Sequence, residues 1–392
     1  MRLSCLQQNL ARGLSIVGRA VATRTTLPIT QNVLIQTDNS RLKLSATNLE
    51  IAITTWVGAQ VDEEGACTVP ARLLTEFINA LPPERVDISL SQRPRGLHLR
   101  CGRFEAHING AEAEEFPPIP SVSGGATAVI DAEALHKAVA QVVFAAATDD
   151  SRPVLTGVKV EMEGEKFTLA AADGFRLAVH KASSRDGVPE PVSFIVPART
   201  LAELNRVLPD QTDPVEVTIA PSKGQCLFRL RNIELVSQLI QGTFPNYTQL
   251  IPQAYASRAV VNLQEFARAV RTASIFARDG SGIIRVHMAP SGQGIGGKLN
   301  ISSKAEEVGE NTAELEASVE GDEARIAFNS RYLTEVLGAL NTPEVALEVT
   351  SPSSPGVFRP AGAGKKAEGR DGSQPPEEGE YVHVIMPMFV QW

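Results

Sequence analysis

The stretch from Gly292 to Lys298, GQGIGGK, is the clearest candidate for phosphate chemistry in the chain. Glycines followed by a lysine form the phosphate-cradling part of a P-loop, in which a magnesium-binding Ser or Thr comes next. Here Leu299 follows the lysine. The residues after it are typical of a strand, so no helix N-terminus is expected to face a phosphate. We expect a glycine-rich hairpin turn, and we keep an enzyme that uses this loop as a minor alternative.

The histidines and cysteines have no spacing typical of a metal centre or a catalytic pair. The 6 histidines form no HExxH motif, and the 4 cysteines, Cys5, Cys67, Cys101 and Cys226, form no CxxC pair. No GxSxG nucleophile elbow occurs either. The sequence therefore predicts a protein without catalytic residues, metal or cofactor, whose thiols are reduced and partly buried.

Arginines form the most suggestive pattern, because they recur on helices predicted in all three parts of the chain. They are Arg12, Arg19 and Arg24, then Arg199 and Arg206, then Arg268, Arg271 and Arg278. One basic helix face is usually only solvated surface, but its repetition favours a function. The one aromatic residue within these groups, Phe276, falls on the apolar face of its predicted helix, which disfavours stacking on single strands. The phosphates of a DNA duplex are the better target.

The overall charge does not exclude such binding. The formal net charge is -8 at pH 7, but it is unevenly distributed. Residues Met1 to Thr37 include arginines and no acidic residue, whereas Glu306 to Glu323 is rich in carboxylates. Because the local field decides what binds at a surface, an acidic protein can carry one basic surface.

Three copies of one helical pattern organise the chain. They lie at Val69 to Leu81, Val196 to Leu208 and Phe328 to Leu340. Aligned without gaps, they place three glutamates together, Glu76, Glu203 and Glu335. Within each copy the apolar residues recur three or four positions apart, which predicts a short amphipathic helix. The spacing of about 130 residues is the length of a domain, so we predict three similar domains.

Each repeat also begins with another helix and contains two groups of strands. Ser4, Asp131 and Asn262 are the expected caps of these first helices. Alternating runs such as 32–37 and 42–46 predict strands. The order helix, strands, helix, strands predicts an α+β fold, with helices on one face of mainly antiparallel sheets. Sheet edges need covering, so we expect edge pairing between domains, within or between chains.

Composition suggests the domain boundaries. Two proline-rich linkers contain Phe116-Pro117 and Phe244-Pro245, and they predict domains at 1–122, 123–254 and 255–392. The third domain has an insertion at about 353–380, rich in Gly and Pro, which is expected to be a long mobile loop. No apolar run approaches the roughly 18 residues of a membrane span, and no signal peptide is evident. We therefore predict a cytoplasmic protein without a membrane partner.

Three short motifs resemble the bacterial sliding clamp family, the beta subunits of DNA polymerase III. They are AADGFRLA at 171–178, FPNY at 244–247 and VIMPM at 384–388. The resemblance spans the whole chain, including the threefold repeat. It implies a non-catalytic processivity factor that forms a ring around duplex DNA, independently of sequence, and tethers the replicative polymerase during strand elongation.

The resemblance also implies site residues. DNA contacts fall on Arg24, Arg72, Arg152 and Arg199, with the other helix arginines in support. A groove between the second and third domains receives short hydrophobic peptides from the polymerase, the clamp loader and repair proteins. Its matching positions are Leu155, Gly174, Phe175, Arg176, Leu177, Pro245, Leu250, Asn329, Tyr332, Val384, Met386, Pro387 and Met388. Phe389 stands where the family often has a basic residue, which leaves the peptide preference open.

Helix geometry predicts how many chains such a ring needs. Six helices, spaced at about 8 to 10 Å, enclose a circle of roughly 15 to 19 Å, which is too narrow for a duplex. Twelve helices leave a hole of about 21 to 28 Å after about 10 Å is subtracted for helix thickness. We therefore predict a head-to-tail homodimer, in which the first domain of one chain meets the third domain of the other. The alternative is a monomeric three-domain peptide-binding scaffold that does not encircle DNA.

Overall fold

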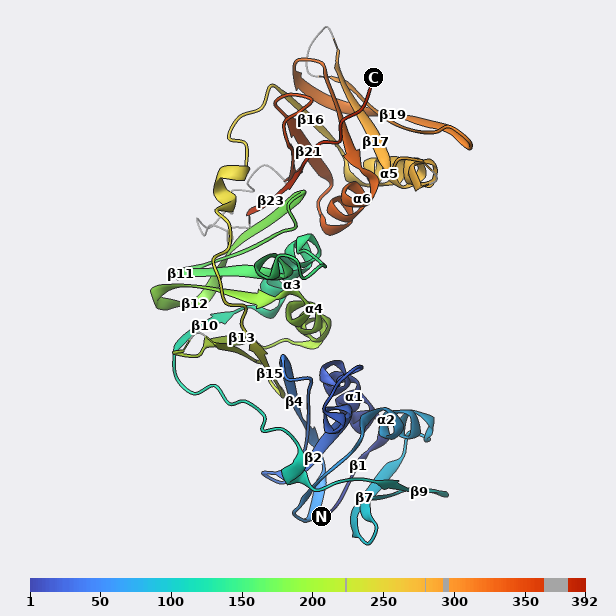
Figure 1. The fold of residues 1–392 in the computed structure, drawn as a ribbon, viewed down its shortest axis with the longest axis vertical. Helices are drawn as coiled ribbons and strands as arrows, with labels where there is room; N and C mark the ends of the chain where they lie inside the picture. The colour runs from blue at the N-terminus through green and yellow to red at the C-terminus, as the bar shows by residue number, and fades with distance from the viewer. Residues whose placement is uncertain (223, 279, 292–295, 363–379) are drawn as a thin grey trace, which may run out of the picture. The chain divides into compact units, whose positions relative to one another are not determined.

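The computed structural model describes residues 1–222, 224–278, 280–291, 296–362 and 380–392. By their contacts these residues form two compact units, whose elements are labelled in Figure 1. Unit 1 comprises Met1–Glu133, Ser184–Glu190 and Arg199–Leu239. Unit 2 comprises the described residues of Ala134–Ser183, Pro191–Ala198 and Ile240–Trp392. Most of the glycine-rich segment (292–295) and of the predicted insertion (363–379) lies outside the described residues. The expectation of a loop is wrong for the described residues Gly356–Ala361, which form a strand paired on both sides, with Val357 and Phe358 buried.

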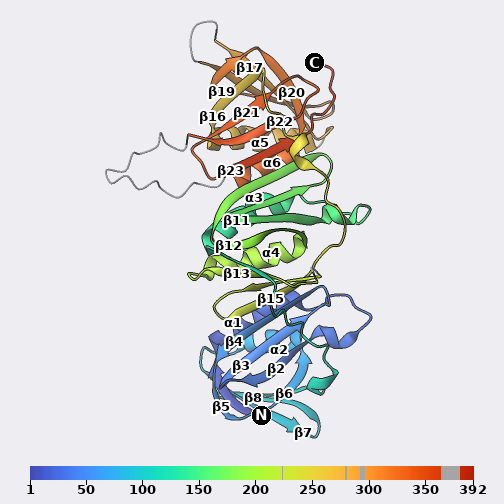
Figure 2. The same cartoon turned by 90° about the vertical axis from the view of Figure 1, so that its left-hand side faces the viewer.

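Unit 1 contains two antiparallel sheets and the helices α1 (Gln7–Val17), α2 (Ala71–Ala80) and nearly all of α4 (Ala198–Val207). The smaller sheet has the strand order β5 (Gln60–Glu63), β1 (Arg2–Leu6), β7 (Arg85–Gln92), β8 (Arg95–Cys101), β9 (Phe104–Asn109). Neighbouring strands of the larger sheet are β6 (Ala66–Pro70), β2 (Asn32–Asp38), β3 (Arg41–Thr47), β4 (Ile51–Gly58), β15 (Ile233–Gln238), β14 (Gln225–Arg229), β13 (Val215–Ile219) and β10 (Ala126–Ile130). Figure 2 shows β2, β3 and β4 side by side.

Unit 2 contains most of helix α3 (Ala132–Val142), together with α5 (Leu263–Arg278) and α6 (Ser330–Ala339). Its strands pair in the order β20 (Ala324–Asn329), β17 (Ile283–Pro290), β18 (Gly297–Ala305), β19 (Gly309–Gly321), β16 (Ser257–Asn262), β21 (Glu344–Val349), β22 (Gly356–Ala361), β23 (Glu380–Ile385) and the first residues of β12 (Arg176–Pro197). Strand β11 (Gly157–Ala172) precedes β12. Short 3-10 turns lie at Gly18–Ala20, Pro28–Gln31, Ala113–Glu115, Val143–Ala145, Pro153–Thr156, Leu208–Asp210 and Tyr247–Leu250.

The three predicted helix copies are confirmed as α2, α4 and α6, each of 10 residues. Leu74, Leu201 and Leu333, which the copies share, are all buried. Helix α1 packs on β3 and β4 beside α2, and α5 packs on β17 and β18 beside α6 (Figure 1). This arrangement confirms paired helices on antiparallel sheet.

Of the predicted helix caps, Asn262 is confirmed and Ser4 is wrong. The Asn262 side chain accepts hydrogen bonds from the Gln264 and Glu265 amides at 3.0 and 3.1 Å, as a cap does. The predicted cap at Ser4 is wrong, because Ser4 lies within strand β1 and α1 begins only at Gln7. Leu3 and Cys5 are both buried where β1 pairs with β7, and tertiary pairing therefore overrides the local capping pattern.

Candidate functional site

Asp173 organises the turn that leads into β12. Its Oδ1 atom accepts the amide hydrogens of Phe175 at 2.8 Å and Arg176 at 3.0 Å. Gly174 has a φ of 94°, a left-handed conformation that glycine adopts without steric cost. Arg152 donates from Nη2 to the Asp173 carbonyl at 2.9 Å, and its guanidinium would lie 2.8 Å from any Cβ at position 174. The turn leaves Phe175 59% exposed and Arg176 only 6% exposed.

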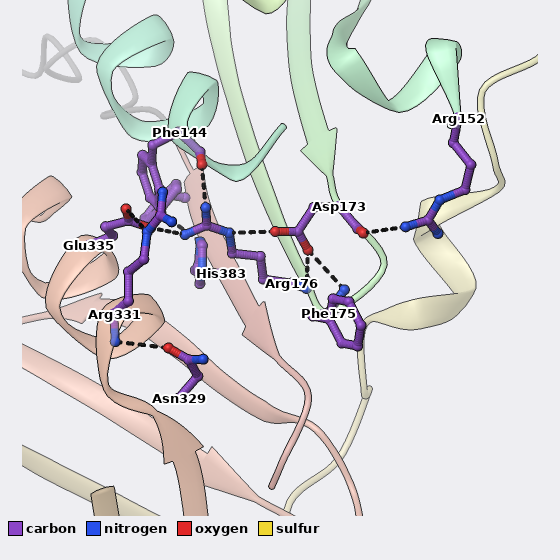
Figure 3. Close-up of polar contacts among 10 residues, drawn as sticks. Phe144, Arg152, Asp173, Phe175, Arg176, Asn329, Arg331, Glu335 and His383 are labelled. Carbon is purple, nitrogen blue, oxygen red and sulfur yellow. Dashed lines mark hydrogen bonds and ion pairs between the residues drawn. The ribbon is translucent and has the colours of Figure 1, made fainter. Parts of the chain in front are cut away.

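The Arg176 guanidinium donates hydrogen bonds to three different parts of unit 2. It donates to Asp173 Oδ2 at 3.0 Å, to the Glu335 carboxylate on α6, and to the Phe144 carbonyl after α3 at 2.6 Å (Figure 3). It also lies 4.5 Å from the centroid of the Tyr332 ring. A planar cation with several fixed donors suits this arrangement better than a lysine would. Because the cation is buried, each partner that it satisfies is also held in place.

Strand β23 lies beside this turn. It pairs antiparallel with β12 in the register Arg176 to Ile385. Beyond the strand, the Met386 amide donates to the Phe175 carbonyl at 2.8 Å, and the Met388 amide donates to the Ala327 carbonyl at 2.7 Å. The backbone of the VIMPM motif is therefore fixed at both ends beside the turn at Asp173.

The residues predicted for the partner groove include buried apolar residues, which we call the floor, and exposed apolar residues, which we call the rim. Leu155, Leu177 and Val384 belong to one buried cluster with Phe244 and Tyr247. Exposed members are Phe175, Leu250, Met386 and Met388, with Gly174 and Pro245 also exposed and Asn329, Tyr332 and Pro387 partly so. We call the thirteen predicted groove residues the partner surface.

Two buried histidines lie on the paired strands β12 and β23, and neither was singled out from the sequence. His180 Nδ1 is 2.7 Å from Gln141 Oε1, and Gln141 donates to the Ala339 carbonyl of α6 at 3.2 Å. His383 stacks on Phe144, with ring centroids 5.5 Å apart. Burial lowers the pKa of His180 to about 4 and that of His383 to about 3, so both rings are neutral at pH 7. Their place in otherwise apolar strands was the available sequence clue.

Unit 1 contains a second example of this arrangement. Asn48 Oδ1 accepts the amides of Glu50 at 3.0 Å and Ile51 at 2.9 Å, as Asp173 does for its own turn. Leu49, in the place of Gly174, has a φ of 78°. Strand β15 pairs with β4 in the register Ile51 to Ser237, and the Gln238 amide donates to the Glu50 carbonyl at 2.8 Å. We call the β4–β15 contact the first junction and the β12–β23 contact the second junction.

A cavity of about 360 Å³ lies at the first junction. Arg12 and Ile16 of α1, Thr55 and Val57 of β4, and Ile233 of β15 are among the residues that line it. Aligned without gaps, Ile16 and Thr55 occupy the positions of Gln141 and His180. Ile16 is apolar and Thr55 is smaller than a histidine, so these two positions cannot form the hydrogen bond that joins Gln141 and His180.

The arginines predicted to contact DNA lie on the protein surface, except for Arg19, which is half-buried. Several form ion pairs, including Arg12 with Asp210 at 2.9 Å and Arg19 with Glu203 at 3.2 Å. Arg72 and Arg206 pair within their own helices, with Glu76 and Glu203. Arg24, Arg199, Arg268 and Arg271 have no ion-pair partner within the part of the chain that the structure describes. The helical members lie on solvent faces, as predicted, and their contact with DNA stays a prediction.

Three family models match the chain in succession. They are the N-terminal domain of the DNA polymerase III beta subunit at residues 1–120, the central domain at 129–246 and the C-terminal domain at 248–367. The beta sliding clamp of Synechococcus elongatus is 32% identical over 365 residues, covering 92% of this chain and 96% of the relative. The chain belongs to the beta sliding clamp family. The clamp of Bacillus subtilis is 28% identical over 371 residues, with the same coverage of both chains.

Solved clamps have the same fold. The crystal structure of the Bacillus subtilis sliding clamp superimposes with a TM-score of 0.88 at 26% identity, covering 100% of both chains. A Pseudomonas aeruginosa clamp bound to griselimycin gives a TM-score of 0.87 at 25% identity, also over 100% of both chains. These matches confirm the predicted family, the three clamp domains and the role in DNA replication, and they do not support the scaffold alternative. Among the described residues, no helix is long and apolar enough to cross a membrane.

Proposed function

We propose that this chain encircles duplex DNA as a homodimer and tethers the replicative polymerase and other partners, without catalytic activity of its own. The observation that carries this proposal is the succession of three beta-subunit domains along one chain. A homodimer then supplies twelve helices, enough to line a hole of about 21 to 28 Å. We also propose the domain boundaries 1–122, 123–254 and 255–392, and action in the cytoplasm.

Free strand edges support head-to-tail closure. Strand β9 is the last strand of the smaller sheet in unit 1, and residues 309–316 of β19 pair only with β18 among the described residues. The two junctions already join strands of successive domains edge to edge. We propose that β9 of one chain pairs with β19 of its partner in the same way. Phe104 on β9 and Ile275 on α5 are exposed apolar residues that such a contact would cover.

DNA contact is proposed for ten arginines of the helices and nearby turns, all of them exposed except the half-buried Arg19. Arg24, Arg72, Arg152 and Arg199 are the main contacts, and Arg12, Arg19, Arg206, Arg268, Arg271 and Arg278 support them. Guanidinium groups bind phosphates without reading bases, which suits a protein that must slide. The ion pairs of Arg12 and Arg72 are exposed, so exchange of a carboxylate for a phosphate costs little.

Partner binding is proposed for the partner surface. Its buried floor and exposed methionine and phenylalanine rim suit short hydrophobic peptides from the polymerase, the clamp loader and repair proteins. Methionine side chains adapt to ligands of different shape, which suits a surface with several partners.

Retention on circular DNA is the decisive experiment. The loaded clamp should stay on closed circular DNA at high salt and leave when the circle is linearised, whereas a merely electrostatic binder dissociates as salt rises. The triple variant Arg24→Glu, Arg72→Glu and Arg199→Glu should load poorly, while Arg85→Glu, an exposed arginine on β7, is the matched control. A monomer at micromolar concentration, or loss at high salt from the closed circle, would contradict the ring.

Deletion of residues from Met386 onward tests the partner surface. It removes Met386 and Met388 from the exposed rim but leaves β23 complete. We expect polymerase stimulation to be abolished, with the dimer intact in sedimentation. Unchanged stimulation would defeat the assignment of partner binding to this surface.

A further inference from the structure

The chain continues past the partner surface with Phe389, Val390, Gln391 and Trp392. Phe389 is 87% exposed and Trp392 is 52% exposed. Aromatic side chains left in water beside other exposed apolar residues commonly mark a contact site, because they bury a large area with few rotatable bonds. We call residues 389–392 the terminal tail.

The terminal tail is held against the sheet of unit 2. It leaves the partner surface at Met388, whose amide bonds the Ala327 carbonyl of β20 at 2.7 Å. Further on, Arg285 Nη2 donates to the Gln391 carbonyl at 3.5 Å. Arg285 lies opposite Ala327 on the paired strand β17, so both contacts belong to one region of the sheet. Phe389 projects to solvent between these two attachment points.

The tail therefore continues an apolar surface that already has an exposed rim. Met386 and Met388 are themselves exposed, and Phe389 follows them directly. Phe175, in the turn before β12, accepts the Met386 amide of the same segment through its carbonyl. The continuity of the tail with this rim identifies the occupant as a longer piece of the same kind of partner peptide.

We propose that Phe389 and Trp392 extend the partner surface and bind an apolar residue that flanks the short hydrophobic segment of a partner. This inference rests on the proposed function of the partner surface and adds a preference to it. Partners with apolar flanks would be selected over partners with polar flanks. Burial of one aromatic contact predicts a preference of about tenfold in Kd.

Peptide binding to the full chain tests the preference. The probe is the shortest segment of the cognate replicative polymerase that binds the clamp, alone or with three added residues on each side, either apolar or Gly-Ser. Apolar flanks should lower Kd about tenfold relative to Gly-Ser flanks in the unmodified chain. The preference should vanish in the double variant Phe389→Ala and Trp392→Ala, whose affinity for the short segment stays within about twofold.

Tryptophan fluorescence provides a direct readout, since the chain has only 2 tryptophans. In a Trp56→Phe background the remaining emission is that of Trp392, and it should shift to the blue only with the apolar-flanked probe. The proposal would be overturned by equal affinity for both flanked probes or by a preference that survives the double variant. An emission shift caused by clamp concentration alone would also overturn it. Failure of the intact dimer to bind the short segment would instead count against the partner surface itself.

Discussion

The first and second junctions use one backbone plan with different side chains. In both, an Asn or Asp side chain accepts two amides at a turn, and the following strand pairs with a strand that ends beside that turn. At both junctions a glutamate of the repeated helix accepts a hydrogen bond from an arginine. Glu203 accepts from Arg19, and Glu335 accepts from Arg176. The repeated helix that predicted three domains thus also supplies an acceptor at each junction.

The junctions differ in what fills them. Arg176 is buried and has three acceptors, whereas the side chain of Arg19 is 29% exposed and pairs with Glu203. A hydrogen-bonded His180 occupies the second junction, whereas the first junction has Thr55 and a cavity of about 360 Å³. Gly174 leaves its turn without a side chain, whereas Leu49 occupies the equivalent position. Side-chain choice, rather than backbone plan, therefore gives the second junction its partner surface.

The largest predicted difference concerns the two arginines. Arg176→Ala should lower the free energy of unfolding by about 3 to 5 kcal/mol, because it leaves Glu335 and Asp173 without their buried cation. Arg19→Ala, the matched variant, should cost less than about 1 kcal/mol, because its pair is partly solvated. Urea unfolding of the dimer measures both. Equal losses would show that the junctions do not differ in this way.

Acidification should weaken the second junction and spare the first. The unfolded chain binds protons on its histidines below pH 6.5, whereas the lowered pKa values keep folded His180 and His383 neutral until about 4 and about 3. The contribution of the two neutral histidines to the free energy of unfolding is therefore fully present above pH 6.5. It is lost as pH falls, at up to about 1.4 kcal/mol per pH unit for each histidine.

Hydrogen exchange at pH 7.5 and 5.5, corrected for intrinsic rates, measures that loss. Amides of β12 and β23 should lose protection relative to those of β4 and β15. The double variant His180→Gln and His383→Phe is the control and should be less sensitive to pH. Parallel losses at both junctions would contradict the assignment to these histidines.

Exchanging the residue types at Leu49 and Gly174 should change the free energy of unfolding in opposite directions, and by less than Arg176→Ala does. Leu49 has a φ of 78°, so Leu49→Gly removes a strain of about 1 kcal/mol, partly offset by the added freedom of the unfolded chain. Gly174→Leu should destabilise the fold by about 1 to 2 kcal/mol. It also crowds Arg152 and should weaken peptide binding. Thermal unfolding and peptide titration measure these effects, and a stabilising Gly174→Leu would refute them.

The smallest effect is expected at the rim of the cavity. Arg12→Ala removes an exposed ion pair with Asp210, so stability should change by less than about 0.5 kcal/mol. The same variant should lower the salt dependence of DNA binding, because one phosphate contact is lost. A large loss of stability would mean that this pair supports the first junction as Arg176 supports the second.

Much of this protein was predictable from its sequence because the information is periodic. The amphipathic period of the three helix copies predicted α2, α4 and α6, and alternation predicted β2 and β3. The Ser4 cap failed because local patterns cannot show that β7 pairs with residues 2–6. The motifs around Gly174 and Met386 indicated which residues form the partner surface.

The sequence by itself determined the three domains, their helices and the positions of the exposed arginines, because these depend on neighbours along one element. Only the tertiary structure decided that Arg176 joins the turn after α3, the turn before β12 and α6, and that His180 and His383 are buried and neutral. It also decided that a cavity lies at the first junction. Such properties arise from contacts between different elements of the chain, such as Arg176 with Glu335, and no local period encodes them.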